Sequence, residues 1–302
     1  MSNPSLGQGS TDVEYALGHS SRELDRLSFQ GNVLGPYTRD FLVRAGLKEG
    51  MRVLDVGSGG GDVSFLAAEL VGPEGSVLGV DRSAEAVERA RTRAIRCNIH
   101  GEDGPTKTSA KTMSPVAFAV GDPASMHFDR PFDAIIGRFV LMYQEDPAAS
   151  LRNMLRNVQE GGLVAFQELD STTCRSWPAG PVFDEAARWL MEALRRSGAR
   201  TELGLEIHSL FLDCGLPAPK MRIDAVVSGE EDSAVFLLVA EAVRSLVPTL
   251  EKLKIASAAE VQIDDLAERM REEVVAKRGV AMSYGLVGAW ARKPITQEVE
   301  DR

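Results

Sequence analysis

The chain has 302 residues, of which 44% are hydrophobic and 26% are charged, a balance typical of a globular protein with its own core. Its 44 acidic residues outnumber its 34 basic residues, and the net charge of −10 argues against broad binding to nucleic-acid phosphates, which depends on many Lys and Arg contacts. The 3 cysteines are far apart and the 4 histidines show no metal-ligand spacing, so we expect neither a disulfide framework nor a metal site.

The first residues, MSNPSLGQGSTDVEYALG, lack the charged start and the apolar core of a signal peptide. No apolar run approaches the ~18 residues that a membrane span requires. We therefore expect a cytoplasmic protein whose partner is a small molecule, with no nucleic acid and no membrane bound. The sequence carries no signal for an oligomeric state.

The N-terminal part of the chain has a helical pattern. Residues 1–10 are small and polar and are predicted to form a disordered tail. Thr11-Asp12-Val13-Glu14 has the form of a capping box, which predicts a helix over about 11–29. A second helix is expected over about 31–46. Because neither segment has the pattern of a strand, 11–46 is predicted to be an N-terminal helical cap.

From Met51 onward, short apolar strands alternate with helices, which indicates a parallel sheet covered by helices on both faces. The first five predicted strands are 51–56, 76–80, 116–120, 132–136 and 163–169. Helices are predicted at 63–70 and 83–99. A third begins at Asp146-Pro147, a cap followed by proline at the first helical position, and ends at Gly161-Gly162.

The remaining segments complete the predicted architecture. Residues 101–115 are small, polar and turn-forming, and are expected to be an exposed, mobile insertion. The later expected elements are helices at 181–197, 205–214, 232–250 and 257–277 and strands at 220–227 and 281–291. We therefore expect an α/β fold with a Rossmann-like, doubly wound, seven-stranded sheet. The predicted divisions after the cap are a core (47–230), a helical insertion over the edge of the sheet (231–277), and a last strand and tail (278–302). The late helices are expected to form part of a substrate chamber.

The stretch VLDVGSGGGD, residues 53–62, leads a buried strand into four glycines within five residues and then into a helix. This arrangement places backbone N–H groups at the carboxyl edge of a parallel sheet, where such sheets bind ligands. The dinucleotide pattern G-x-G-x-x-G fails, because the sixth position counted from Gly57 is Asp62, whose charge would repel a pyrophosphate. The alternative pattern D-x-G-x-G-x-G fits at Asp55, Gly57, Gly59 and Gly61.

Two more carboxylates follow the next strands. Asp81 ends the second strand, where a carboxylate can accept hydrogen bonds from both hydroxyls of a ribose, as it also does in NAD sites. Gly121-Asp122 follows the third strand, where a carboxylate can accept a hydrogen bond from an adenine amino group. The glycine turn and these two carboxylates lie at successive strand ends. One adenosine-binding site explains all three better than three unrelated turns do.

Residues 51–170 resemble the class I S-adenosylmethionine-dependent methyltransferases, in the branch of UbiE-like small-molecule enzymes (methyltransferase type 11). The segments that carry the resemblance are VLDVGSGGGD, LGVDRS (78–83), AVGDP (119–123), FDAIIGRFVLMY (132–143) and EGGLVAFQE (160–168). The resemblance implies S-adenosylmethionine as cofactor, S-adenosylhomocysteine as product, and methyl transfer to a small, partly apolar molecule, as in specialised metabolism. Two alternatives stay open: a regulatory or non-methylating S-adenosylmethionine-binding protein, and an NAD-dependent oxidoreductase, which Asp62 disfavours.

The resemblance also implies roles for single residues. Residues 57–59 would contact the methionine and ribose parts of the cofactor through their backbone, and Asp81 would hold the ribose hydroxyls. Arg82 would lie alongside the adenine, Asp122 would accept from its amino group, and Pro123 would flank the ring.

Four further residues complete this set. Arg138 would lie near the cofactor carboxylate and Phe139 would form a wall of the site, while Tyr15 and Gln30 from the N-terminal cap would close over the cofactor or pack. The implied cofactor-binding residues are Tyr15, Gln30, Asp55, Gly57, Ser58, Gly59, Gly61, Asp81, Arg82, Gly121, Asp122, Pro123, Arg138 and Phe139.

An oxygen nucleophile usually needs a general base, which often contributes ~10²–10⁴-fold. The candidates are His19 in the cap motif LGHS, Tyr143 after the fourth strand, and Glu168 at the end of the fifth. His19 is the first choice, and Glu168 is expected to order the mouth of the site. The chain departs from the UbiE pattern after the fourth strand. The insertion at 101–115 and the helical segment at 231–277 are further departures, so the substrate and the acceptor atom stay open.

Overall fold

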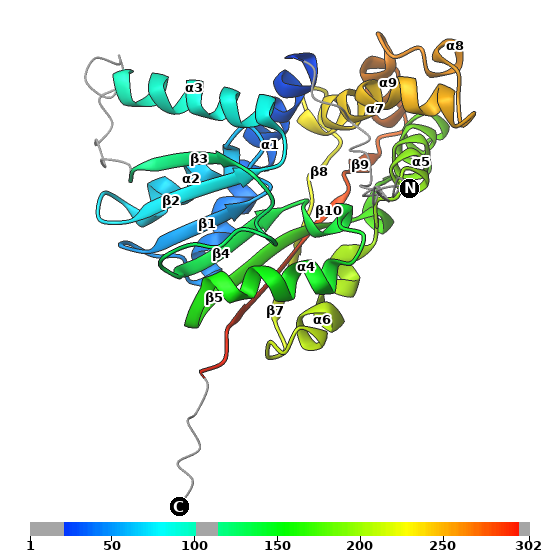
Figure 1. The fold of residues 1–302 in the computed structure, drawn as a ribbon. Coiled ribbons are helices and arrows are strands. Elements are labelled where there is room, and N and C mark those ends of the chain that lie inside the picture. Colours follow the sequence, from blue (N-terminus) through cyan, green and yellow to red (C-terminus); the bar gives the residue numbers. More distant parts are fainter. Residues whose placement is uncertain (1–20, 101–113, 296–302) are drawn as a thin grey trace, which may run out of the picture.

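The computed structural model describes residues 21–100 and 114–295, so the predicted tail, most of the insertion at 101–115, and the candidates Tyr15 and His19 lie outside the described residues. A seven-stranded sheet with the order β3-β2-β1-β4-β5-β10-β7 forms the centre of the molecule (Figure 1). Its strands are β1 (Arg52–Val56), β2 (Ser76–Asp81), β3 (Val116–Val120), β4 (Phe132–Arg138), β5 (Val158–Asp170), β7 (Lys220–Asp224) and β10 (Gly285–Arg292).

The strands β1 to β5 pair in parallel, whereas β10 runs antiparallel to both of its neighbours, β5 and β7. In the central strand β1, Val53 and Leu54 point to opposite faces, and both are fully buried. Burial on both faces explains why β1 is a continuous apolar run instead of an alternating one. The predicted doubly wound, seven-stranded sheet is confirmed.

Helices cover both faces of the sheet. On one face lie α1 (Ser21–Ala45) and α2 (Asp62–Val71), with Phe41 and Ala67 in the same buried cluster as Val53 of β1. The helix α3 (Ala84–His100) packs on β3 and β2. The opposite face carries α6 (Leu203–Asp213) against β5 and β10, with α4 (Pro147–Met154) packed on α6 (Figure 1).

A helical layer lies beside the sheet. It consists of α5 (Pro181–Arg196), α7 (Ala234–Lys252) and α9 (Leu266–Ala276), which pack on one another, and the short helix α8 (Ala258–Val261) (Figure 1). A second, three-stranded antiparallel sheet with the order β6-β9-β8 accompanies them. Its strands are β6 (Arg175–Trp177), β8 (Val227–Ser228) and β9 (Val280–Met282). The sequence patterns did not predict this sheet, because each strand has at most three residues.

The structure corrects the prediction of a helix boundary at Gly31. One continuous helix, α1, runs through this residue. A Cβ atom at Gly31 would lie only 2.6 Å from Cγ of Asp62, at the start of α2. The glycine therefore permits close packing of α1 on α2 and does not end a helix.

The predicted helix from Asp146 to Gly161-Gly162 is also too long. The helix α4 ends at Met154, a 3-10 turn (Leu155–Asn157) follows, and β5 has begun at Val158. Gly161 has a positive φ of 72°, and the register of β4 on β5 shifts in this region. The glycine pair therefore lies at an irregularity inside a strand.

Three predicted elements near the C-terminal end are divided in the structure. The strand expected at 220–227 is β7 plus β8, and the strand expected at 281–291 is β9 plus β10. The helix expected at 257–277 is α8 plus α9, because Gln262 adopts a left-handed φ of 47° between them. Within the described ranges, no helix is both long and apolar enough to cross a membrane. The same residues contain no cluster of three or more His, Cys, Asp or Glu side chains suited to hold a metal ion.

Candidate functional site

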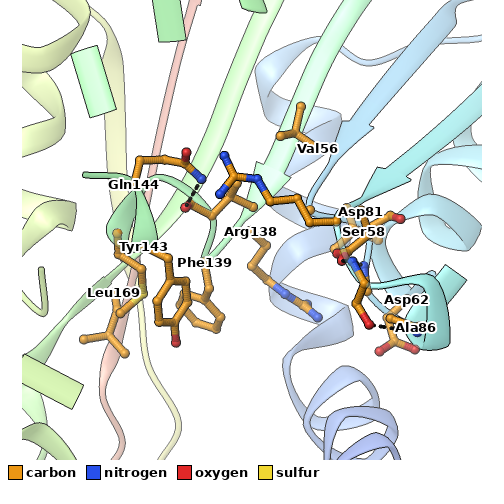
Figure 2. Close-up of a pocket in the computed structure, with 18 of the residues that line it drawn as sticks. Val56, Ser58, Asp62, Asp81, Ala86, Arg138, Phe139, Tyr143, Gln144 and Leu169 are labelled. Carbon is orange, nitrogen blue, oxygen red and sulfur yellow. Dashed lines mark hydrogen bonds between the residues drawn. The ribbon is translucent and has the colours of Figure 1, made fainter. Parts of the chain in front are cut away.

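A cavity of about 280 Å³ opens at the carboxyl ends of β1, β2 and β4. Figure 2 shows Ser58, Asp62 and Asp81 on one side of it, Phe139, Tyr143 and Leu169 on the other, and Arg138 between them. We call the first side the glycine-turn half, lined by Gln30, Gly57, Ser58, Gly59, Gly60, Asp62, Asp81, Arg82, Ser83, Asp122, Pro123 and Arg138. We call the second side the apolar half, lined by Phe139, Val140, Met142, Tyr143, Met154, Leu169, Leu190, Leu194, Ala242 and Tyr284.

The glycine turn is shaped by positive φ angles. Gly57, Gly59 and Gly61 have φ values of 62°, 51° and 88°, a region that glycine enters without the steric cost of a Cβ atom. A Cβ at Gly57 would lie 2.7 Å from Cγ2 of Val140, whereas a Cβ at Gly59 would have no atom within 4 Å. The turn therefore needs glycine for its backbone shape, and at Gly59 that backbone borders open space.

The Asp81 carboxylate fixes the turn from the neighbouring strand. Its Oδ2 atom accepts a hydrogen bond from the Gly59 N–H at 2.9 Å, and its Oδ1 atom accepts one from the Ser83 N–H at 2.8 Å. Each carboxylate oxygen has a second lone pair, so both can still accept a bond from a ligand.

Asp122 holds a similar position at the end of β3. Its Oδ1 atom accepts from the Ala124 N–H at 2.9 Å, and its Oδ2 atom forms an ion pair with the Arg82 guanidinium at 2.8 Å. Pro123 lines the cavity beside this pair. The structure thus brings together Arg82, Asp122 and Pro123, as the sequence predicted.

Arg138, the last residue of β4, extends between the two halves of the cavity (Figure 2). Its Nη1 atom donates a hydrogen bond to Oγ1 of Thr38 in α1, at 3.0 Å. Burial lowers the pKa of Arg138, and the carboxylates of Asp62 and Asp55 act in the opposite direction. A guanidinium keeps its charge in proteins, so a cation faces the cavity here.

Three predicted cofactor residues do not line the cavity. Asp55 lies behind the turn, where its Oδ2 atom accepts from Oγ of Ser64 at 2.5 Å, and burial raises its pKa to about 7. Gly61 permits close contact with Phe118, and Gly121 permits close contact with Met126. These residues support the shape of the site and do not face its interior.

The structure describes two of the three candidate bases, and these two lie in different surroundings. Tyr143 lines the cavity, and His19 lies outside the described residues. Glu168 is fully buried, and its carboxylate accepts hydrogen bonds from the N–H groups of Val140, Leu141 and Met142. Its side chain therefore holds the backbone that follows β4, which agrees with the expected ordering role.

Phe139 begins this stretch with a left-handed φ of 57°, which is uncommon for a residue other than glycine. Its N–H donates to the carbonyl oxygen of Gln167 in β5 at 2.8 Å. Its ring meets that of Tyr284 edge-on, with 6.0 Å between the centroids. In turn, the Tyr284 hydroxyl accepts a hydrogen bond from Nε2 of Gln30 at 2.7 Å, which joins α1 to the cavity wall.

Most of the apolar half was not predicted from the sequence. Leu190 and Leu194 come from α5, and Ala242 comes from α7. Helical spacing of apolar residues indicates only a buried face, so it cannot separate a cavity wall from ordinary core. Met154 and Leu169 lacked a signal for the same reason.

The glycine-turn half fits an adenosine cofactor that carries an amino acid. Oγ of Ser58 is buried and has no hydrogen-bond partner in the described structure, although it belongs to a residue that lines the cavity. A buried hydroxyl without a partner is costly, and a polar ligand would satisfy it. The carboxylates of Asp81 and Asp122 suit ribose hydroxyls and an amino group, and the Arg138 cation suits a carboxylate.

Comparisons with known proteins agree with this site. Residues 47–197, half of the chain, match the family described as methyltransferase domain. An arsenite methyltransferase from Aquipseudomonas alcaligenes is 33% identical over 129 residues, which are 42% of this chain but only 35% of that protein. The ubiquinone/menaquinone biosynthesis C-methyltransferase UbiE from Xylella fastidiosa is 27% identical over 212 residues, 64% of this chain and 78% of that one.

The same fold occurs in solved structures. The crystal structure of the YcgJ protein from Bacillus subtilis aligns with a TM-score of 0.53 at 16% identity, and the alignment covers 86% of this chain and 99% of that one. The family match confirms the resemblance to methyltransferases, and the shared fold confirms the predicted fold class. The chain therefore belongs to the methyltransferase-domain family and has UbiE among its relatives.

Proposed function

We propose that this family member binds S-adenosylmethionine in the glycine-turn half of the cavity and transfers its methyl group to a small, partly apolar molecule in the apolar half. One observation carries the proposal: the glycine turn, two strand-end carboxylates and an apolar wall line a single cavity. Such a cavity can hold a polar nucleoside and an apolar molecule next to each other.

Different residues of the glycine-turn half would bind different parts of the cofactor. The free lone pairs of the Asp81 carboxylate suit the ribose hydroxyls, and Asp122 suits the adenine amino group, with Arg82 and Pro123 beside the ring. The Arg138 guanidinium would bind the carboxylate of the methionine part. This contact would also compensate the charge that the fold partly buries.

When bound, S-adenosylmethionine supplies a methyl group on a sulfonium leaving group. The contribution of the chain is to align the acceptor with that group and to exclude water. Good alignment can be worth about 7–11 kcal/mol of the barrier. Phe139 and Tyr143 line the apolar half, and Tyr143 is the candidate base that the described cavity contains.

The names of the two relatives above indicate very different reactions, the methylation of arsenite and a C-methylation in ubiquinone/menaquinone biosynthesis. Arsenic(III) is a soft ion, and soft ions prefer thiolate ligands. Of the cysteines whose side chains the structure describes, neither Cys174 nor Cys214 lines the cavity. Burial also raises the pKa of Cys174 to about 12, which opposes the thiolate form. These observations favour an organic acceptor.

The proposal includes a cytoplasmic location and a small-molecule partner in place of nucleic acid. The net charge of −10 supports the second point, because phosphate backbones repel a chain with excess carboxylates.

Calorimetric titration tests the proposal. We expect the wild type to bind S-adenosylhomocysteine and not NAD, because Asp62 lines the cavity where a pyrophosphate would lie. Asp81→Ala should weaken this binding by at least tenfold. Glu85→Ala, which removes an exposed carboxylate from α3, is the matched control and should bind like the wild type.

The titration also separates the alternatives. A preference for NAD, or no binding of S-adenosylhomocysteine to folded wild type, would refute the proposal. Mass spectrometry of acceptor mixtures for a gain of one methyl group then distinguishes a methyltransferase from a protein that only binds the cofactor.

A further inference from the structure

We propose that the acceptor is an uncharged molecule with an apolar, ring-containing body that lies between α5 and α7, and that Ala242 sets how large this body can be. The inference rests on the proposed function, because it describes the second substrate of the same cavity. It adds a substrate class and a specificity-determining residue.

The apolar half extends away from the glycine turn into the helical layer. Leu190 and Leu194 are four residues apart on α5, so both side chains lie on the same face of that helix. Ala242 lines the cavity from α7, which packs directly on α5. These three side chains are at most 4% exposed. The wall is therefore enclosed by protein and not open to solvent.

The charge of the wall limits the acceptor. Among the described residues that line the apolar half, there is no aspartate, glutamate, lysine, arginine or histidine. Glu168 is nearby in sequence, but its carboxylate is engaged by three backbone N–H groups. A charged group placed among these side chains and away from the Arg138 guanidinium would lose its hydration without gaining a partner, which is very costly.

Aromatic rings line the entrance to the apolar half. Phe139 and Tyr284 meet edge-on. Figure 2 shows the rings of Phe139 and Tyr143 on the same side of the cavity. Aromatic side chains pack favourably on the faces and edges of other rings. A planar ring therefore fits this entrance better than a flexible chain of equal size.

Ala242 is the small side chain in this wall. Its neighbours at the buried positions of α7 include the larger Leu238, Val243 and Leu246. A longer side chain at 242 would extend into the cavity, whereas the backbone of the helix would stay unchanged. Ala242 also lies outside residues 47–197, which match the family, whereas Leu190 and Leu194 lie inside them, so this one side chain of the wall comes from beyond the shared domain.

Binding to the full-length protein in the presence of saturating S-adenosylhomocysteine tests the inference. The probes are phenol, 2-naphthol and 2-hydroxyanthracene, together with a sulfonated 2-naphthol as the charged counterpart. We expect wild type to bind 2-naphthol at least tenfold more tightly than its sulfonated form. We expect Ala242→Leu to weaken binding of 2-naphthol at least tenfold and of phenol less than threefold, with the affinity for S-adenosylhomocysteine unchanged.

Two further variants act as controls. Ala234→Leu makes the same change at the first residue of α7, away from the cavity, and should bind all probes like the wild type. Ala242→Gly enlarges the space and should improve binding of 2-hydroxyanthracene relative to phenol; it serves as the test if the leucine variant does not fold.

The outcomes are distinct. If the folded wild type does not bind S-adenosylhomocysteine, the proposed function itself is refuted. If the wild type binds S-adenosylhomocysteine, three results would refute this inference alone. They are equal binding of the sulfonated probe and 2-naphthol, no binding of any neutral ring compound, and changes at Ala242 that act equally on all ring sizes.

Discussion

The Glu168 carboxylate, buried at the end of β5, accepts a hydrogen bond from the Leu141 N–H across 2.8 Å. Two longer bonds, from Val140 at 3.1 Å and Met142 at 3.2 Å, join the same carboxylate. These residues follow the left-handed Phe139, whose ring lines the cavity. The carboxylate thus positions one wall of the site without facing the cavity.

Glu168 should make stability depend on pH. Burial raises its pKa to about 7, above the value of 4.5 for an exposed glutamate. The folded chain then binds the proton more tightly than the unfolded chain, so this contribution to stability is complete below about pH 4.5 and is lost as the pH rises through about 7. We expect the free energy of unfolding of the wild type to fall across this range.

Glu168→Gln removes the titration and should show a smaller fall, by on the order of 1–3 kcal/mol between about pH 5 and pH 8. Urea unfolding at several pH values measures the difference. Asp55, whose pKa is also raised, is present in both proteins and cancels in the comparison. Parallel curves for the two proteins would contradict this role of Glu168.

Gly57→Ala should cost more stability than an alanine at a glycine with similar φ but free space. At Gly57 the new Cβ would meet Val140 at 2.7 Å, whereas at Gly50, with a φ of 81°, it would meet no atom within 4 Å. Both variants carry the left-handed penalty of about 1–2 kcal/mol. Overpacking should add roughly 1–3 kcal/mol at Gly57 alone. Equal losses in urea unfolding would show that Val140 moves without cost.

Arg138→Met should weaken binding of S-adenosylhomocysteine about 10- to 100-fold, the range expected for a lost charge-assisted hydrogen bond. Binding of 5′-methylthioadenosine, which lacks the amino-acid part, should change little. Calorimetry with both ligands measures the ratio. An equal loss for both ligands would mean that Arg138 only supports the fold, for instance through its bond to Thr38.

Tyr284→Phe should destabilise the fold by about 1–3 kcal/mol, because it leaves the buried Gln30 amide without the hydroxyl that accepts its hydrogen bond. Tyr37→Phe makes the same change on α1 away from the cavity and is the control. Thermal unfolding compares the two. If both variants unfold alike, the bond between α1 and the cavity wall contributes little.

The sequence predicted those features of the site whose signals are local. Gly57, Asp81 and Asp122 lie at the ends of three apolar strands, and parallel strands bring their carboxyl ends to one edge. Their convergence therefore needed only the alternation of strands and helices. The family resemblance, and not this reasoning, implied Arg138, which is the last residue of β4.

Features that depend on packing between distant segments could not be predicted in this way. Ala242 and Leu190 have the spacing of any buried helical residue, and only the contact of α7 with α5 makes them a cavity wall. At Gly31, by contrast, a local signal predicted a helix end that the structure does not contain. Glycine often ends a helix, but here it allows the approach of Asp62 on a different helix.

The position of β10 has a consequence for how the protein is made. Of the strands that the structure describes, β10 is the last in sequence, yet it lies inside the sheet between β5 and β7. While the ribosome is still synthesising residues before 285, β5 and β7 have no partner on the sides that β10 will occupy. Unpaired strand edges are templates for association with other chains. The newly made chain is therefore most prone to aggregate before β10 has been synthesised, and a truncation just before β10 would make that stage permanent.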